Sequence, residues 1–255
     1  MSRKFVKDLV SVITPVYNAE RFIQQTLESM VAQTYENIEF ILVDDCSSDS
    51  SAQIIQSFKK KYSNIVYHLQ EKNMGAGVAR NKALEIAKGR YVAFLDSDDL
   101  WMPEKTKCQI DLMKSTGTPL CYAAIEMIDE QSKIIKGKRS IPEECDYNLL
   151  LHNTLIATSS VIVDRNQLGD FRMPVRRGGQ DYATWLMLLR GNVVAKGINE
   201  VLVKYRISKG SLSSNKFKSI KQVWDIQTHD MGIGKINALY NMVCFVKNAL
   251  MKYLK

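Results

Sequence analysis

The sequence predicts an α/β fold in which a mostly parallel sheet is flanked by helices and followed by a C-terminal helical extension. Three observations favour this class. Short apolar runs alternate with segments of helical periodicity through the first half of the 255-residue chain. Several of these runs are apolar on both faces, which is typical of parallel strands covered on each side. From residue 216 onward the pattern is helical.

The predicted elements of the first half follow one another in β-α order. The expected strands are 9–14, 38–43, 65–69 and 91–95, and the expected helices are 22–32, 50–58 and 76–87. Pro15 stops the first strand, and Gly89 closes the third helix. Sheets of this order bind ligands at the carboxyl ends of their strands.

The second half is less regular. The expected strands are 120–128, 155–163 and 201–207, with a hairpin turn near 129–131, a basic segment at 133–139 and a helix at 182–189. Because no linker is visible, we divide the chain into one α/β domain, residues 1–215, and a helical tail, residues 216–255.

Composition narrows the function classes. A net charge of +8 (35 basic and 27 acidic residues) suits a nucleic acid, an anionic membrane surface, a phosphate-rich substrate or simply a basic surface. Five scattered cysteines and three histidines make a structural zinc site improbable and favour a reducing compartment. We expect no signal peptide and no membrane-spanning helix.

Three acidic residues, Asp96, Asp98 and Asp99, directly follow the fourth predicted strand. Carboxylates this close repel one another unless a cation or solvent compensates. Oxygen ligands suit Mg²⁺ or Mn²⁺, which also grip a substrate diphosphate. Taken alone, such a run is more often a solvated turn that caps the helix near Pro103. Its position after a buried strand favours the metal site.

Asp44 and Asp45 end the second predicted strand, ahead of Cys46 and small hydroxyl residues. A carboxylate here can accept the imide N–H of a uracil base. Ser48 or Asp49 can also cap the following helix. We expect both roles, one at each end of the segment.

Arg80 follows a Gly-x-Gly sequence that is not a dinucleotide fingerprint, because the third glycine is missing and the first strand does not precede it. Its guanidinium could bind phosphates or pair with the acidic cluster. Asp181 begins a predicted helix, where an acid is either a favourable N-terminal charge or a general base toward an acceptor hydroxyl. Arg176 and Arg177 beside it could contact an anionic acceptor.

In this order, the motifs resemble the family-2 glycosyltransferases of the GT-A fold, which is Rossmann-like, and particularly small bacterial enzymes of O-antigen and capsule assembly. The matching segments are 12–18, 42–49 (the family's VDDGSTD), 79–81 (ARN), 94–99 (the DxD motif) and 180–182 (ED-Y). The chain departs from the pattern at Cys46, where glycine is usual, and at Gln180, where glutamate is usual.

The resemblance implies an inverting, metal-dependent hexosyltransferase with an Mn²⁺ or Mg²⁺ cofactor. The implied donor is a UDP-sugar, of glucose or galactose type, and the implied acceptor is an undecaprenyl-diphosphate-linked saccharide of surface polysaccharide synthesis. By analogy Asp98 binds the metal and Asp181 is the catalytic base. The implied donor-binding residues are Thr14, Pro15, Tyr17, Asp45 for the base, Arg80, and Asp96 for ribose or phosphate.

The tail resembles a basic amphipathic helix. Apolar residues recur at helical spacing from Ile236 to Leu254, and no acidic residue interrupts Lys235, Lys247, Lys252 and Lys255. Such a helix can lie on an anionic membrane surface, or it can pack on the domain or on a dimer partner. We expect a cytoplasmic protein attached peripherally to the cytoplasmic face of the inner membrane, and no nucleic-acid partner.

Three alternatives differ in class. A sugar nucleotidyltransferase would carry a glycine-rich basic loop after the first strand, and a processive synthase would carry Gln-x-x-Arg-Trp and spanning helices. A glycosyltransferase-like binding subunit without activity would be expected to lose the acidic cluster or Asp181, and both are present.

Overall fold

The computed structural model describes residues 3–176, 178–208 and 216–251. The strands are β1 Val6–Val16, β2 Ile38–Asp44, β3 Ile65–Leu69, β4 Gly89–Phe94, β5 Leu100–Trp101, β6 Leu120–Ile128, β7 Ile134–Arg139, β8 Glu144–Cys145, β9 Ile162–Asp164 and β10 Ala195–Arg206. The α-helices are α1 Ile23–Val31, α2 Ser51–Lys59, α3 Ala76–Ile86, α4 Lys105–Thr116, α5 Tyr147–Leu151, α6 Arg165–Leu168, α7 Gln180–Leu188, α8 Lys216–Asp225 and α9 Lys235–Met251. Two further turns are η1, a 3₁₀-helix at Thr158–Ser160, and η3, a π-helix at Ile226–Asp230.

The strands form one mixed sheet in the order β3-β2-β1-β4-β9-β6-β10-β5, with β7 paired to β6 and β8 to β10. The first four strands are parallel, as the β-α order predicts. The next strand, β9, runs antiparallel to both β4 and β6, and β10 is again parallel to β6. The predicted α/β class with a Rossmann-like sheet and a C-terminal helical extension is confirmed.

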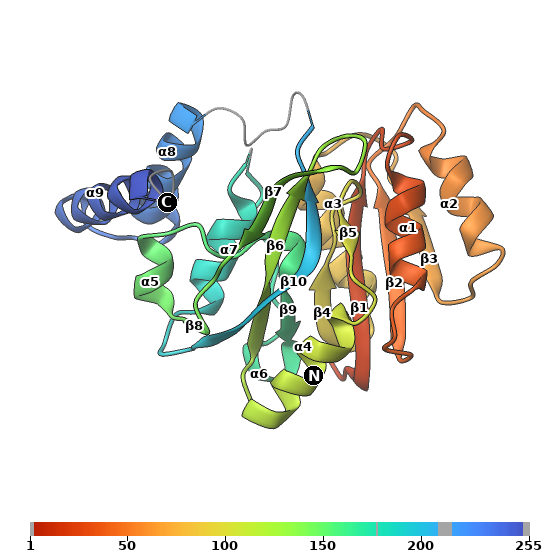
Figure 1. Cartoon of the computed structure of the whole chain (residues 1–255), viewed down its shortest axis with the longest axis horizontal. Coiled ribbons are helices and arrows are strands. Elements are labelled where there is room, and N and C mark those ends of the chain that lie inside the picture. Colours follow the sequence, from red (N-terminus) through yellow and green to blue (C-terminus); the bar gives the residue numbers. More distant parts are fainter. Residues whose placement is uncertain (1–2, 177, 209–215, 252–255) are drawn as a thin grey trace.

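Each face of the sheet carries its own hydrophobic core, covered by helices (Figure 1). Neighbouring residues of β1 illustrate the division, since Val12 belongs to the core under α1, α2 and α4, whereas Ile13 belongs to the core under α3, α5 and α7. Side chains of a strand alternate between faces, so a strand covered on both faces must be apolar throughout. This is why the first strands read as continuous apolar runs.

The C-terminal helices share the second of these cores. Val223, Ile226, Met231 and Met242 are buried in it together with Trp185 of α7. Figure 1 shows α8 and α9 at one end of the molecule and α2 at the other. The domain boundary after residue 215 stays a prediction, and Lys252 and Lys255 lie outside the described residues.

Two predicted elements of the second half differ from the structure. The strand expected at 155–163 is wrong over most of its length, because Thr158–Ser160 form a 3₁₀ turn and only Ile162–Asp164 are extended. Two of its hydroxyl side chains, Thr158 and Ser159, donate hydrogen bonds to acidic residues of the site, described below. The last strand is longer than predicted and begins at Ala195.

Two expectations concern the environment of the chain. All five cysteines are free. Among the described residues, no helix has both the length and the hydropathy needed to cross a bilayer.

Lys105 is an unusual member of the core. Its side chain is fully buried, its Nζ donates a 2.6 Å hydrogen bond to Gln109 Oε1, and the same atom lies 3.9 Å from the centroid of the Trp101 ring. Burial penalises the ammonium form and lowers the pKa of Lys105 to about 7. The residue therefore makes folding depend on pH.

Lys105→Met should remove this dependence. Because the pKa of Lys105 is about 7 in the folded chain and near the ordinary lysine value of 10.5 in the unfolded chain, the unfolded chain binds the additional proton between these values. Stability conferred by the site therefore rises with pH across that window. One proton amounts to about 1.4 kcal/mol per pH unit. Urea unfolding at about pH 7 and about pH 9 measures the free energy of unfolding of both proteins. Between these pH values, the wild type should become more stable relative to the variant by up to about 1.4 kcal/mol per pH unit. An unchanged difference would contradict the assignment.

Candidate active site

The loops after β1, β2 and β4 meet at one edge of the sheet. These strands are parallel neighbours, with Val16 in register with Asp44 and Ile13 in register with Phe94. Their carboxyl ends therefore lie side by side. Backbone contacts also tie the loops together, since Asn18 N–H donates to Ser47 Oγ at 3.0 Å. The predicted donor residues of the first loop therefore lie beside the two acidic groups that follow the second and fourth strands.

The first loop presents only one of its predicted donor contacts to solvent. Tyr17 is 53% exposed, whereas Thr14 and Pro15 are buried. The Thr14 hydroxyl is buried without a hydrogen-bond partner among the described residues. Thr14 and Pro15 therefore shape the strand end, and Tyr17 is the side chain within reach of a ligand.

Asp45 organises the second loop. Its carboxylate accepts hydrogen bonds from Met74 N–H at 2.8 Å, Gly75 N–H at 2.6 Å and the Gln70 side-chain amide. The residue is only 2% exposed. Asp45 thus fixes the loop that leads into α3. The next residue, Cys46, has a φ of 66°, a left-handed conformation that glycine adopts most readily.

Asp49 lies just before α2, where a helix cap is predicted. The N-cap residue is Ser50, whose side chain makes no cap hydrogen bond. Asp49 Oδ1 instead accepts from Ser51 N–H at 3.0 Å, at the first residue of α2, and its Oδ2 accepts from Glu20 N–H at 2.9 Å. Asp49 therefore satisfies one N–H at the start of the helix and joins the helix to the first loop.

The three acids after β4 have different environments. Asp99 is buried, and its carboxylate accepts from Ser159 Oγ–H at 2.5 Å and from Arg206 N–H at 2.8 Å. Burial, followed by the charges of Asp98 and Asp96, raises its pKa well above the ordinary range. Asp99 is thus a structural acid of the loop.

Asp98 is the acid most available for a ligand. Burial, followed by the neighbouring charge of Asp96, raises its pKa to about 6. Among the described residues, no other side chain hydrogen-bonds its carboxylate. An acid that is destabilised in this way and lacks a partner gains most from a cation.

Arg80 brings the remaining acids together. It is 8% exposed, and its Nη2 pairs with Asp96 Oδ1 at 2.5 Å. Burial has the largest single effect on its pKa and lowers it, but the charges of Asp96, Asp181 and Asp98 outweigh burial and raise the pKa. The charge of this one buried guanidinium is therefore attracted both to the acidic loop and to the predicted base, Asp181.

Asp181 stands at the first turn of α7 and is held by a residue that the sequence did not single out. Thr158 Oγ1–H donates to Asp181 Oδ2 at 2.9 Å. No hydrogen bond to Asp181 Oδ1 occurs among the described residues, so one carboxylate oxygen is oriented and the other stays available.

Ser159, which follows Thr158 in η1, makes hydrogen bonds to the acidic loop. Its hydroxyl donates to Asp99 and accepts from Asp96 N–H at 3.1 Å, while its carbonyl accepts from Trp101 Nε1–H at 2.7 Å. The turn η1 therefore connects the acidic loop with Asp181. The available signal was a run of three hydroxyl residues inside an apolar segment.

Gln180, the first residue of α7, connects this helix to Arg80. Its Oε1 accepts from Arg80 Nη1–H at 3.2 Å, and its Nε2–H donates to the carbonyl of Arg176 at 3.2 Å. An amide makes both contacts because it is a donor and an acceptor. Glutamate, which the family usually has here, would lack the donor.

The acids fit a weakly held divalent ion better than an all-protein metal cage. Within the described part of the chain, no three His, Cys, Asp or Glu side chains converge as a ready metal site. Mg²⁺ and Mn²⁺ sites often use one or two carboxylates, the remaining ligands being water and substrate phosphates. Asp98, with Asp96 beside it, would supply that set.

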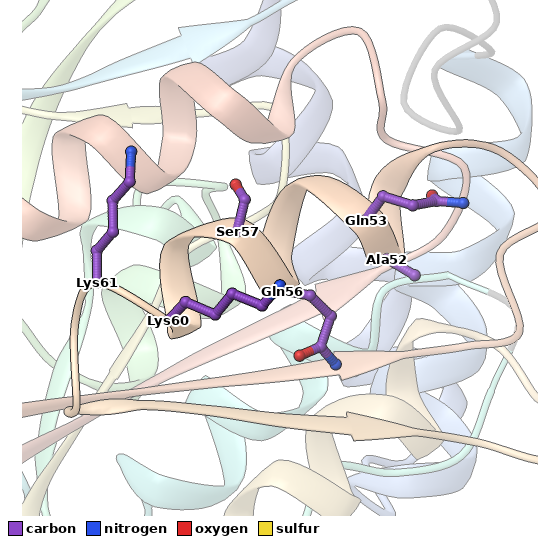
Figure 2. Close-up of a pocket in the computed structure, with 6 residues that line it drawn as sticks. All are labelled: Ala52, Gln53, Gln56, Ser57, Lys60 and Lys61. Carbon is purple, nitrogen blue, oxygen red and sulfur yellow. The ribbon is translucent and has the colours of Figure 1, made fainter.

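An open hollow of about 580 Å³ lies elsewhere. Figure 2 shows that it is lined by one face of α2 and the residues just after it: Ala52, Gln53, Gln56, Ser57, Lys60 and Lys61. No carboxylate and none of the site residues above contributes to it, so it has no part in the candidate site.

The family described as "Glycosyl transferase family 2" matches residues 11–173, which include all the strand-end loops. The chain belongs to this family. It is 40% identical over 248 residues to the "Putative teichuronic acid biosynthesis glycosyltransferase TuaG" of Bacillus subtilis, covering 97% of this chain and 98% of that protein. It is also 40% identical over 219 residues to the "UDP-Glc:alpha-D-GlcNAc-diphosphoundecaprenol beta-1,3-glucosyltransferase WfgD" of Escherichia coli, covering 86% of this chain and 85% of that protein.

Solved structures share the glycosyltransferase fold. S. aureus TarS, residues 1–349 in complex with UDP-GlcNAc, has a TM-score of 0.70 at 22% identity and covers 93% of this chain and 71% of its own. The mannosyltransferase PcManGT of Pyrobaculum calidifontis, in complex with GDP-Man and Mn²⁺, has a TM-score of 0.69 at 19% identity and covers 89% and 65%. The predicted membership of the glycosyltransferase family 2, with a GT-A-type fold, is confirmed.

Ser159→Ala should destabilise the fold because it leaves the buried Asp99 carboxylate without one of its two donors. A buried acceptor that loses its partner costs about 1–3 kcal/mol. Ser160→Ala is the matched control, since Ser160 Oγ–H donates to the nearby carbonyl of Ala157 at 2.7 Å and not to an acid of the site. Denaturant midpoints should fall more for Ser159→Ala, and equal losses would contradict the role given to Asp99.

Proposed function

We propose that the chain is an inverting, metal-dependent hexosyltransferase that moves a sugar from a UDP-sugar to an undecaprenyl-diphosphate-linked saccharide. The observation that carries the proposal is Arg80, a buried guanidinium that pairs with Asp96 and also donates to Gln180, the residue before Asp181. It unites, in one cluster, acids suited to a donor diphosphate with an acid suited to an acceptor hydroxyl. Family membership supplies the reaction class.

For the donor, we assign the nucleotide to the loops after β1 and β2. Asp45 would meet the uracil base, Tyr17 would flank it, and Thr14 and Pro15 would fix the backbone between them. Asp96 and Arg80 would meet the ribose and the diphosphate. The name of WfgD, which specifies UDP-Glc, and the UDP-GlcNAc complex of TarS support a UDP-sugar, of glucose or galactose type.

For the metal, we assign Mn²⁺ or Mg²⁺ to Asp98. The raised pKa of this acid supports the assignment, as does the lack of a competing side-chain hydrogen bond from the described residues. The Mn²⁺ complex of PcManGT supports it by analogy. When bound, the cation neutralises charge that develops on the leaving diphosphate.

In the transfer, Asp181 would take the proton of the acceptor hydroxyl as that oxygen attacks the anomeric carbon from the face opposite UDP. Thr158 holds Oδ2 of this carboxylate, which leaves Oδ1 to receive the proton. Arg80, which as an arginine stays protonated, would lend positive charge to the leaving group. An α-linked donor would give a β-linked product.

For the acceptor side, we propose that α9 rests on the anionic cytoplasmic face of the inner membrane. Ala238 and Met242 pack into the protein, whereas Ile236 is 86% exposed and lies on the outer face with Leu239, Tyr240 and Val243. Lys235 and Lys247 are exposed on the same helix. An apolar stripe with cations suits a membrane interface, and the lipid-linked acceptor in the name of WfgD supports this location.

A panel of nucleotide sugars, supplied with Mn²⁺ and a synthetic lipid-diphosphate-linked sugar, tests the proposal as a whole. Turnover of a UDP-sugar is expected. Binding of UDP-sugar without turnover or donor hydrolysis would instead favour a non-catalytic binding subunit.

Asp98→Ala should abolish the stimulation of donor binding by Mn²⁺, because the variant lacks the proposed metal ligand. Calorimetric titration of UDP-sugar with and without the metal measures the effect. Asp111→Ala, which removes an exposed acid paired with Lys107 on α4, is the control and should keep the stimulation. Equal stimulation in both variants would overturn the metal assignment.

Asp181→Asn should stop transfer while leaving donor binding intact, because the amide cannot accept the acceptor's proton. General-base catalysis contributes about 10²–10⁴-fold, so kcat should fall by at least about 100-fold. Initial rates and donor titration on the same preparation separate the two effects. Near-normal rates would show that another group is the base.

The double substitution Leu239→Glu and Val243→Glu should weaken attachment to anionic vesicles, because it places two acids on the exposed stripe of α9. Sedimentation with phosphatidylglycerol-rich vesicles measures attachment. Leu69→Glu, at an exposed apolar position on β3, is the matched control. Vesicle binding that is absent in the wild type, together with dimers in light scattering, would favour a protein partner for α9.

A further inference from the structure

The loop ahead of Asp181 lies against the C-terminal helices. Gly178 and Gly179 have left-handed φ values of 97° and 69°. A Cβ at Gly178 would lie 2.4 Å from Gln222 Nε2 of α8, and one at Gly179 would lie 2.8 Å from Ile226 Cδ1 of η3. The two glycines therefore allow both the turn and the close approach of α8 and η3.

An ion pair joins the same loop to η3. The guanidinium of Arg176 pairs with the carboxylate of Asp230, and Arg176 Nε–H donates to the carbonyl of Gly178 at 3.1 Å. The carbonyl of Arg176 in turn accepts from Gln180, which also contacts Arg80. Asp230 is thus connected, through Arg176 and Gln180, to the start of α7 and to the donor side of the site.

The π-helix that carries Asp230 is itself anchored next to Asp181. Gln227 is fully buried, and its Nε2–H donates to the carbonyl of Leu151 at 2.9 Å. The hydroxyl of Tyr182, the residue after Asp181, lies 3.3 Å from the same carbonyl. A π-helical turn is rare and frequently marks a functional site. The π-helical turn thus places Gln227 beside the contact of Tyr182 and Asp230 beside Arg176, on either side of Asp181 in the sequence.

We propose that the C-terminal extension is a positioning element of the reaction, in which Asp230 acts through Arg176 to hold the loop and first turn that carry Asp181. The inference rests on the proposed role of Asp181 as the base. Asp230 and Arg176 are positioning residues, since neither is assigned a contact with the reacting atoms. A base displaced by about 1 Å can lose about 100-fold in rate, so a restraint of this kind has kinetic consequences.

A double-mutant cycle tests the ion pair. In the full chain, with the UDP-sugar that turns over best and a synthetic lipid-diphosphate-linked sugar, Asp230→Ala and Arg176→Ala should each lower kcat by about ten-fold or more. The double variant should be no slower than either single one, because the two residues act as a unit. Donor binding and the KM for the donor should not change. Glu144→Ala, which removes the exposed Lys196–Glu144 pair on β8, is the control and should keep kcat.

The outcomes are distinct from those of the proposed function. Singles within two-fold of wild type, or a double variant that is slower by the product of the two, would overturn the positioning role. A raised KM for the acceptor in Arg176→Ala alone would show an acceptor contact instead, which also overturns it. If Asp181→Asn transfers normally, the base assignment fails; if Asp181→Asn is inactive and Asp230→Ala is normal, only the positioning role fails.

The glycine contact gives a second test that does not depend on charge. Gly179→Ala and Gly117→Ala introduce similar backbone strain, at φ values of 69° and 71°, but a Cβ at Gly117 meets nothing within 4 Å. Thermal midpoints should fall in both variants, whereas kcat should fall only in Gly179→Ala. Adding Ile226→Val, which removes the Cδ1 atom in the way, should restore part of the lost kcat. Equal kcat in the two glycine variants would count against the inference.

Discussion

The buried carboxylate of Asp99 is the contact on which the candidate site depends. A carboxylate out of water is costly unless donors compensate it, and here the donors come from Ser159 and from the backbone of Arg206. These residues belong to η1 and to the end of β10, which lie far from Asp99 in the sequence. By recruiting them, Asp99 fixes the acidic loop against the second half of the sheet, while Asp96 and Asp98 stay partly exposed beside it.

The parallel half of the sheet brings the acidic loops together, and helices α3 and α7 add Arg80 and Asp181. Three adjacent strands bring Tyr17, Asp45 and Asp98 to one edge without any contact among these side chains being required. Helix α3 then places Arg80 among the acids, where its charge offsets theirs. A second buried guanidinium, Arg206, donates from Nε to the carbonyl of Asp98 at 2.7 Å. The site therefore combines a backbone arrangement that many sequences share with two buried guanidinium groups that offset the charge of the acids.

The sequence predicts structure best where a single strand or helix determines the local fold without help from residues distant in the chain. The strands up to β4, their terminal acids and the pairing of Arg80 with the acidic cluster follow from apolar runs and from carboxylates at strand ends. The turn η1 could not be predicted, because Thr158 and Ser159 leave the extended conformation for hydrogen bonds to residues distant in the chain. The contact of Asp230 with Arg176 depends likewise on a tertiary arrangement that no local pattern encodes.

The turn η1 also bears on how such enzymes diversify. Adjacent residues of one turn hold the acidic loop and Asp181, so a change in this turn would disturb both halves of the chemistry together. Substitutions should be tolerated more readily in segments that contact neither, such as the mostly exposed strand β7. An engineer who exchanges segments between relatives would keep residues 158–160 unchanged. The exchange would also stop short of the turn before β7, since Arg206 binds both that turn and Asp99.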